Sequence, residues 1–164
     1  MKTGSLAVAA IAALITTLLV PPSLRLVWNT TASMPVGLYV VGHAYPRHGD
    51  LLVTRLPPEM EALAVSRGLL LPNTPVLKAI AALGGDLACR SGTLITINGS
   101  LAASARKFDL QGRSLPTWNG CRRLAAHETF ILAQHPDSFD SRYYGPVSLA
   151  LAVGTARPLL TCPK

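Results

Sequence analysis

The sequence predicts a mostly β domain with one short helix, carried on a single N-terminal transmembrane helix. Three observations lead to this prediction. An uncharged apolar run spans Leu6 to Val20, short β-branched runs bounded by Gly and Pro follow it, and Asn98-Gly99 marks a tight hairpin turn. The 164 residues leave room for one domain plus an appendage. We therefore divide the chain into a membrane anchor at 1–24 and an extracytoplasmic domain at 25–164.

The apolar run has the length of a short membrane span. At about 1.5 Å rise per residue, the roughly 18 residues of 4–21 approach the ~30 Å thickness of the hydrocarbon layer. The run is either an uncleaved anchor or the hydrophobic region of a signal peptide. We favour the anchor, because the small residues that a cleavage site needs, at 30–33, lie in the segment of the candidate nucleophile. Lys2 inside and the bulk of the chain outside is the expected orientation.

Strand and turn signals divide the rest of the chain. Strands are expected at 37–41, 50–54, 76–83, 94–98, 129–134 and 147–153. A helix is expected after Pro57-Pro58, with proline in its first turn, acidic residues near its start and Gly68 as its C-cap. The segment 106–119, with a glycine, a proline and mixed charge, is expected to be an exposed loop.

The charge pattern argues against nucleic-acid binding. Lys and Arg number 15 against 8 acidic residues, but no basic run exceeds two residues and aromatic residues make up only 5%. A nucleic-acid binder is expected to cluster its basic residues on one face. The net charge of +7 instead favours anionic lipid head groups as neighbours.

The three cysteines give no sign of a metal site. Cys89, Cys121 and Cys162 form no CxxC pair and have no nearby His at ligand spacing, so neither zinc nor another cofactor is expected. The spacing leaves two alternatives open. Cys89 and Cys121 form a disulfide, or all three are unpaired thiols.

Three segments could carry chemistry. Ser33 lies in NTTASMPVGLY (29–39), a loop of small hydroxyl residues that can hold its Oγ exposed; the alternative is a polar linker. In an expected strand, Lys78 shares a face with Val76 and Ile80. Burial there would lower its pKa from about 10.4 by up to ~3–5 units, where the amine can act as general base. The alternative is a lysine that reaches water from a strand end.

The third segment is PDSFDSRYYGPV (136–147). Asp140 and Arg142 are two apart, so in an extended segment they share a face, and Ser138 precedes them. The alternative interpretation is a charged loop with an internal ion pair.

Four motifs occur in a fixed order: 33–39 (SMPVGLY), 49–53 (GDLLV), 78–86 (KAIAALGGD) and 138–147 (SFDSRYYGPV). Together they resemble the type I signal peptidase family, and more closely its conjugative-transfer branch, the TraF-like pilin peptidases. The third motif has Ala79 for the family's Arg and Gly84 for its Pro, which we expect to loosen the local backbone. The short elements 112–116 and 118–121 also look similar to the middle region of that branch.

The resemblance implies a membrane-anchored serine protease with a signal-peptidase-like β domain. Ser33 would be the nucleophile and Lys78 the general base. The Ser33 backbone N–H and the Thr31 hydroxyl would form the oxyanion hole. Ser138 would hydrogen-bond and orient the Lys78 amine. A Ser-His-Asp triad is less expected, because no GxSxG motif accompanies Ser33.

The remaining implied roles are structural. Asp140 and Arg142 would pair to hold their loop. The implied location is the periplasmic side of a bacterial inner membrane, with a single membrane pass, and this oxidising compartment favours the Cys89–Cys121 disulfide. Membrane lipid and other conjugation or secretion components are the expected neighbours.

The resemblance further implies that the substrate is a pilin precursor, trimmed and joined head to tail. One alternative is a general type I signal peptidase that removes export signals. Another is a non-catalytic, membrane-tethered β module of a pilus or secretion assembly. A peptidoglycan-active Ser-Lys enzyme would need Ser-x-x-Lys on one helical turn, which the 45-residue separation (78 − 33) of Ser33 and Lys78 excludes.

Overall fold

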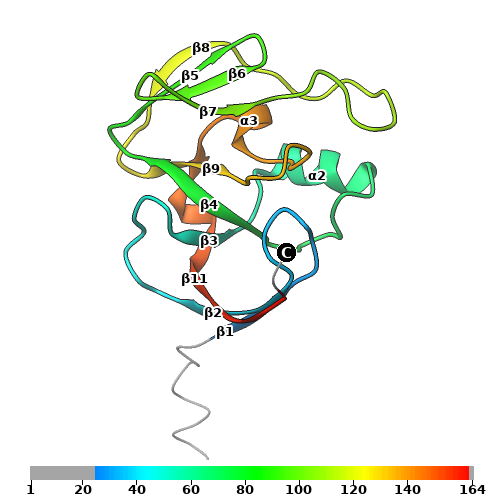
Figure 1. Ribbon diagram of the computed structural model, residues 1–164, viewed down its shortest axis with the longest axis vertical. Coiled ribbons are helices and arrows are strands. Elements are labelled where there is room, and N and C mark those ends of the chain that lie inside the picture. Colours follow the sequence, from blue (N-terminus) through cyan, green and yellow to red (C-terminus); the bar gives the residue numbers. More distant parts are fainter. Residues whose placement is uncertain (1–24, 163–164) are drawn as a thin grey trace, which may run out of the picture.

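The computed structural model describes residues 25–162, which form two antiparallel sheets and short helices (Figure 1). The larger sheet has the order β1-β2-β11-β3-β4-β9-β10, and the smaller one β7-β6-β5-β8. The larger sheet comprises β1 (Arg25–Asn29), β2 (Gly37–Gly42), β3 (Leu51–Thr54), β4 (Val76–Leu83), β9 (Glu128–Leu132), β10 (Val147–Ser148) and β11 (Ala152–Thr161). The smaller comprises β5 (Leu87–Ser91), β6 (Leu94–Ile97), β7 (Ser100–Ser104) and β8 (Gly120–Arg123). The helices are α2 (Pro58–Ser66), α3 (Ser141–Tyr144) and the 3-10 turn η1 (Leu149–Leu151).

The smaller sheet is an insertion between two neighbouring strands of the larger one. The chain enters it from β4 and returns to β9, and these two strands pair with each other. At the entry, a Cβ on Gly84 would lie 2.6 Å from the Ala126 Cα and 2.8 Å from the Ala125 oxygen. Only glycine allows this close approach. Gly84 was expected to loosen the backbone here, but it packs the two connections together.

Apolar side chains from both sheets fill the joint between them. Ala82 and Phe130 of the larger sheet pack with Ala88 and Ile95 of the smaller, all essentially buried. The ring of Trp118 meets the Phe130 ring edge to face, with centroids 6.0 Å apart. This shared core fixes the inserted sheet relative to β4, the strand that carries Lys78.

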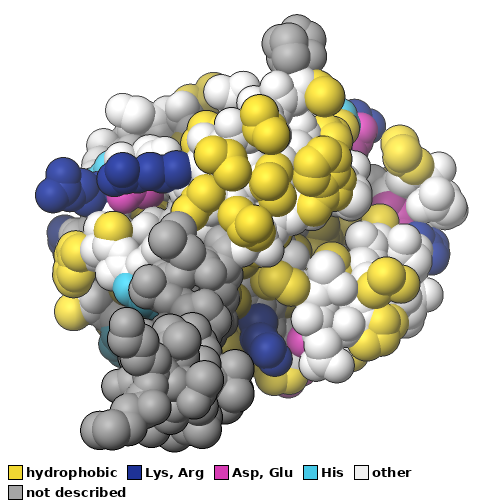
Figure 2. Space-filling model, turned by 90° about the horizontal axis from the view of Figure 1, so that it is seen from below, with side chains coloured by type: hydrophobic (Ala, Val, Ile, Leu, Met, Phe, Trp, Pro, Cys, Tyr) yellow, Lys and Arg dark blue, Asp and Glu magenta, His cyan; other side chains and the backbone are white. Residues whose placement is uncertain are grey.

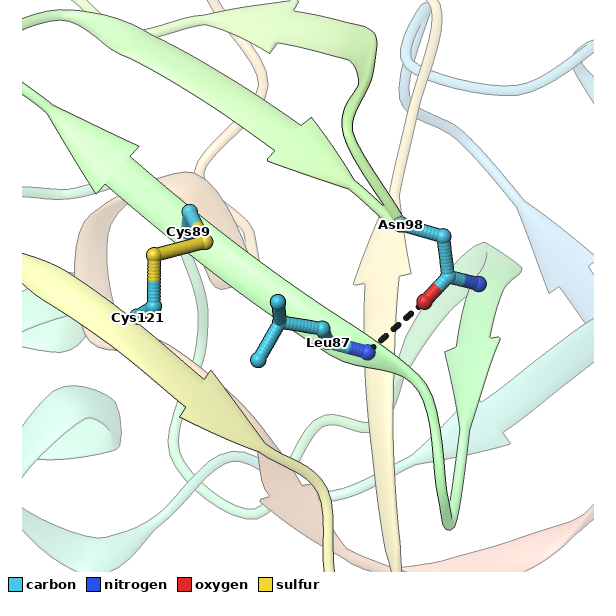
Figure 3. The surroundings of a disulfide bond; sticks show 4 residues. All are labelled: Leu87, Cys89, Asn98 and Cys121. Atoms are coloured by element: carbon cyan, nitrogen blue, oxygen red, sulfur yellow. Dashed lines mark hydrogen bonds between the residues drawn. A yellow bond between two sulfur atoms is a disulfide. The ribbon is translucent and has the colours of Figure 1, made fainter.

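The hairpin predicted at Asn98-Gly99 is present between β6 and β7. Both residues have positive φ, 50° and 83°, the conformation that a tight two-residue hairpin turn requires. The Asn98 side-chain oxygen also accepts from the Leu87 N–H at 2.9 Å (Figure 3). In the same sheet, Cys89 of β5 and Cys121 of β8 lie opposite each other and are joined by a disulfide (Figure 3).

Most predicted elements are confirmed with small changes in their bounds, and one is wrong. The predicted strand at 147–153 breaks after Ser148, where the Ser148 hydroxyl accepts from the Ala150 N–H and starts η1. The chain then continues as the ten-residue β11, most of which was not predicted. The strands β1, β5, β7 and β8 were also not predicted, because their short polar or mixed sequences carry no clear alternation.

The predicted anchor at 1–24 lies outside the described residues. In the portion from Arg25 to Cys162, no helix has the length and apolar character needed to cross a bilayer. The boundary between anchor and domain therefore stays a prediction.

Candidate active site

Ser33 and Lys78 meet at one end of β4. Ser33 lies in the loop between β1 and β2, and Lys78 is the third residue of β4. The Lys78 Nζ lies 2.9 Å from the Ser33 Oγ and 2.8 Å from the Ser138 Oγ. The structure therefore brings together one residue from each of the three segments that the sequence singled out.

The Ser33 loop is held from inside by Asn29, at the end of β1. The Asn29 amide nitrogen lies 2.9 to 3.1 Å from the carbonyl oxygens of Thr31, Met34 and Pro35. The Tyr39 hydroxyl donates to the same Pro35 oxygen at 2.7 Å. Asn29 and Tyr39 are both buried. These bonds close the loop into a compact turn and fix the direction of the Ser33 side chain.

Lys78 points to an apolar face of β4. Its register partner on β3 is Leu52, and its same-face neighbours Val76 and Ile80 pack in the same core cluster as Leu52. Only 6% of Lys78 is exposed. The snorkelling alternative is therefore wrong for this conformation, because the side chain is enclosed rather than extended to water.

This burial changes the protonation of the Lys78 amine. Desolvation lowers the pKa of Lys78 to about 8; the Asp140 carboxylate opposes the shift, and the Arg142 guanidinium adds to it. At pH 8, about half of the amine is then neutral and able to accept a proton.

Ser138 is positioned by a buried ion pair in the following residues. The Arg142 Nε donates to the Asp140 Oδ1 at 2.7 Å, and its Nη2 donates to the Asp140 Oδ2 at 3.0 Å. The same Nη2 donates to the Ala133 carbonyl at 2.7 Å, and the Ala133 N–H donates to the Asp140 Oδ2 at 3.0 Å. The ion pair thus links the two ends of the 133–142 loop through hydrogen bonds.

The expected pairing of Asp140 with Arg142 is present, but in a helical start and not in the extended segment that we expected. Asp140 is the N-cap of α3, and its side chain accepts from the Arg142 N–H. A carboxylate at an N-cap satisfies a free N–H of the first turn. Asp140 itself is extended, and the pair forms where the chain turns from this residue into α3.

Thr31 lies next to Ser33, and its hydroxyl is already within hydrogen-bonding distance of two other side chains. Its Oγ1 is 3.0 Å from the Ser33 Oγ and 3.0 Å from the Asn29 Oδ1. A hydroxyl has one proton to donate, and the Asn29 oxygen can only accept it. For Thr31 to donate to a substrate oxyanion, its hydroxyl must turn away from Asn29.

Two hollows border Ser33. The first is a cleft of about 250 Å³ that also touches Lys78 and Ser138, with apolar walls that include Leu56, Leu69 and Leu77. The second is lined mainly by apolar side chains, four of which are alanines: Met34, Pro35, Ala79, Ala81, Ala102, Leu132 and Ala133. A chain bound at Ser33 would therefore have two hollows with largely apolar walls within reach.

No histidine is hydrogen-bonded to the Ser33 hydroxyl among the described residues; its partners are Thr31 and Lys78. His135 lines the cleft, but its Nδ1 accepts from the Asp137 N–H, and His48 pairs with Asp86 at 2.6 Å. In the part of the chain that the structure describes, no group of three or more His, Cys, Asp or Glu side chains is arranged to hold a metal ion.

Comparison with known proteins identifies the family. The family described as signal peptidase, peptidase S26, matches residues 2–160. The chain belongs to this family. A plasmid transfer protein TraF from Escherichia coli is 32% identical over 145 residues, covering 81% of each chain. A probable conjugal transfer protein TraF from Sinorhizobium fredii is 30% identical over 144 residues, covering 81% of this chain and 76% of that protein. The resemblance drawn from the four motifs is confirmed.

A solved structure of the family also aligns with this peptidase S26 member. It is a signal peptidase I from Enterococcus faecalis V583, with a TM-score of 0.41 and 17% sequence identity over 70% of this chain and 98% of that one.

Sequence reasoning gave no role to Asn29 and Tyr39, although both lie in the segment that it singled out. Asn29 could have been found as a polar residue at the end of an apolar run, directly before the hydroxyl-rich loop. No comparable signal marks Tyr39, because its ring packs in the core like any strand aromatic while its hydroxyl binds the Pro35 oxygen.

Proposed function

We propose that this S26 family member is a serine endopeptidase in which Ser33 attacks a peptide carbonyl and Lys78 accepts its proton. The observation that carries the proposal is the 2.9 Å contact between the Ser33 Oγ and the Nζ of a lysine that is only 6% exposed. The neutral amine takes the Ser33 proton as the Oγ–C bond forms. It then gives that proton to the leaving amine as the C–N bond breaks.

Ser138 keeps the amine oriented through this exchange. The Ser138 Oγ accepts one hydrogen from Lys78, which leaves the nitrogen lone pair free to face Ser33. The Ser33 backbone N–H and the Thr31 hydroxyl, once it has turned from Asn29, would stabilise the oxyanion. Water or a second amine then attacks the acyl carbon and gives a proton to Lys78, and Lys78 passes this proton to the Ser33 Oγ as the ester bond breaks.

For the substrate, we propose a pilin precursor of a conjugation machine, because the relatives at 28 to 32% identity are named as plasmid or conjugal transfer proteins. Joining the substrate head to tail would require its own N-terminal amine to attack the acyl-enzyme in place of water. A second candidate, removal of export signals, is supported by the family's description as signal peptidase.

We further propose that the domain works at the outer surface of the inner membrane. One face of the larger sheet supports this. Trp28, Leu38 and Leu160 share one register row across β1, β2 and β11, and Leu26 lies on the same side of β1 as Trp28. Leu26, Trp28 and Leu160 are 61 to 68% exposed. Figure 2 shows hydrophobic side chains gathered at this end of the molecule, where a lipid surface would cover them.

The experiment that tests the proposal is co-expression with a candidate prepilin, read by intact-mass spectrometry. Ser33→Ala and Lys78→Ala should each abolish trimming. Ser66→Ala and Lys107→Ala, at exposed positions away from the site, are the matched controls and should process normally. A product one water lighter than the trimmed linear chain would support joining. Processing by both Ser33→Ala and Lys78→Ala would overturn the proposal in favour of a non-catalytic module.

An exported preprotein serves as the second substrate in the same experiment. If it is cleaved and the prepilin is not, export-signal removal is the function. If only the prepilin is cleaved, the conjugation assignment stands.

A further inference from the structure

The cleft at Ser33 continues into a separate apolar hollow under the 106–119 segment. Three residues line both spaces: Leu69, Asp137 and Phe139. Beyond them, the second hollow is walled by Phe108, Leu110, Leu115 and Tyr143. The mechanism proposed for Ser33 and Lys78 uses none of these four side chains.

The 106–119 segment is held rigidly in place, despite its loop-like sequence. The Asp109 carboxylate accepts from the N–H groups of Gln111 and Arg113 and from the Arg113 Nε at 2.7 Å, which closes a tight turn. Arg67, directly after α2, donates to the Asp109 carboxylate and to the Ser114 carbonyl. The turn is therefore fastened to the end of that helix.

The other end of the segment is fastened to the loop that carries Ser138. The Arg106 Nε lies 2.5 Å from the Asp137 Oδ1, and the Arg106 N–H donates to the Tyr143 hydroxyl at 3.2 Å. The hollow thus lies between two fixed supports, one on α2 and one beside the Lys78–Ser138 contact.

Large apolar side chains are nevertheless left open to solvent at this site. Leu110 is 77% exposed, Phe108 54% and Leu69 46%. The charged side chains around them are paired: Arg106 with Asp137, and Asp109 with both Arg67 and Arg113, which leaves a net charge of only +1 among these five. A rigid hollow with apolar walls next to a catalytic cleft suits an apolar ligand that arrives with the substrate.

We propose that this hollow is a distal specificity site that binds one large apolar side chain of the substrate polypeptide, several residues from the scissile bond. The proposal rests on the proposed peptidase function. The volume of about 120 Å³ suits a side chain and not a folded partner; for comparison, an apolar cavity of about 150 Å³ holds benzene. Because Leu69 and Phe139 border both spaces, a substrate chain bound at Ser33 has the second hollow within reach of its side chains.

The test uses the full chain in detergent and a peptide library made by trypsin digestion of a bacterial proteome. Ser33-dependent cleavage sites are mapped by mass spectrometry. Wild type should enrich Leu, Ile, Met or Phe at one fixed position several residues from the cleaved bond. Leu110→Asp and Phe108→Asp should remove this enrichment, whereas Leu94→Asp, on an exposed leucine of β6, should keep it.

Kinetics on two synthetic peptides separate a role in substrate binding from a role in stabilising the fold. The first peptide carries the distal apolar residue, and the second lacks it. For the first peptide, Leu110→Asp should lower kcat/KM about tenfold through KM, which is the effect of losing part of one buried apolar side chain. For the second peptide it should change nothing, and Leu94→Asp, on the exposed leucine of β6, should behave as wild type on both.

The outcomes separate the two proposals. Ser33-dependent cleavage without a distal apolar preference, or with a preference that survives both Asp substitutions, overturns the specificity site and leaves the peptidase intact. Absence of any Ser33-dependent cleavage, in the library and in the prepilin alike, overturns both.

Discussion

The Lys78 Nζ lies 2.8 Å from the Ser138 Oγ, although 60 residues separate the two in the chain. Ser138 is buried at 4% exposure, so this hydroxyl offers the amine a hydrogen-bond acceptor without admitting water. An amine held in this way keeps its orientation whether it is charged or neutral. The buried pair Asp140 and Arg142 keeps Ser138 in place from the other side.

The pH dependence of acylation follows from the lysine. Because the pKa of Lys78 is lowered to about 8, the neutral base is the minority form below pH 8. We expect the acylation rate to rise about tenfold per pH unit up to pH 8 and then level off. Single-turnover cleavage of a peptide substrate between pH 6 and 10 measures this. A rate that does not change between pH 6 and 8 would rule out Lys78 as the base.

The same lysine should destabilise the folded protein at neutral pH. Its pKa is about 8 folded and near 10.5 unfolded, so the unfolded state binds more protons between these values and stability rises with pH across this window. Urea unfolding of the full chain in detergent should give about 2–3 kcal/mol more stability at pH 10 than at pH 7 from this group. Lys78→Met should lack this gain and be more stable than wild type at pH 7. If Lys78→Met is less stable at pH 7, the burial argument fails.

Breaking the buried Asp140–Arg142 pair should lower the free energy of unfolding more than breaking an exposed ion pair does. Asp140→Asn leaves the Arg142 guanidinium buried without its counter-charge, and we expect a loss of about 3–5 kcal/mol in the free energy of unfolding. Asp137→Asn, in the same loop but in a half-exposed pair with Arg106, should cost less than about 1 kcal/mol. Chemical denaturation of the two variants compares them directly. Equal losses would show that the 133–142 loop does not depend on the buried pair.

Replacing Asn29 should lower kcat and leave substrate binding unchanged. Asn29→Ala removes the bonds to the Met34 and Pro35 carbonyls, so the Ser33 hydroxyl loses its fixed direction. We expect kcat to fall about tenfold to a hundredfold, because small displacements of a nucleophile have effects of this size. Asn119→Ala, at an exposed position, is the control. A change confined to KM would contradict this role.

The disulfide should support stability and leave chemistry unchanged. It links residues 32 apart on neighbouring strands of the smaller sheet. Replacing Cys89 and Cys121 by serine should lower the free energy of unfolding by about 3 kcal/mol. Cys162→Ser should have no effect, because this exposed thiol is free. Loss of peptidase activity in the double variant under native conditions would contradict this purely stabilising role.

The sequence alone selected the candidate catalytic groups that the structure brings together. Ser33, Lys78 and Ser138 were selected from their local patterns and from the ordered motifs, and the β4 strand placed Lys78 on an apolar face from its spacing alone. Local patterns suffice here because strand alternation and tight turns depend on neighbouring residues. The same reasoning failed where structure depends on distant partners: β1, β5, β8 and most of β11 are defined by the strands they pair with.

Only the tertiary structure decided how the groups are oriented and how reactive they are. The inward amide of Asn29 and the Asp140–Arg142 pair depend on how their loops fold back on themselves. The pKa of about 8 for Lys78 depends on its burial and on Asp140 and Arg142, which lie about 60 residues away in the chain. The Thr31 hydroxyl, bonded to Asn29 and not aimed at a substrate, is likewise visible only in three dimensions. Desolvation and hydrogen-bond direction are properties of an enclosed space, and a linear sequence does not specify that space until it has folded.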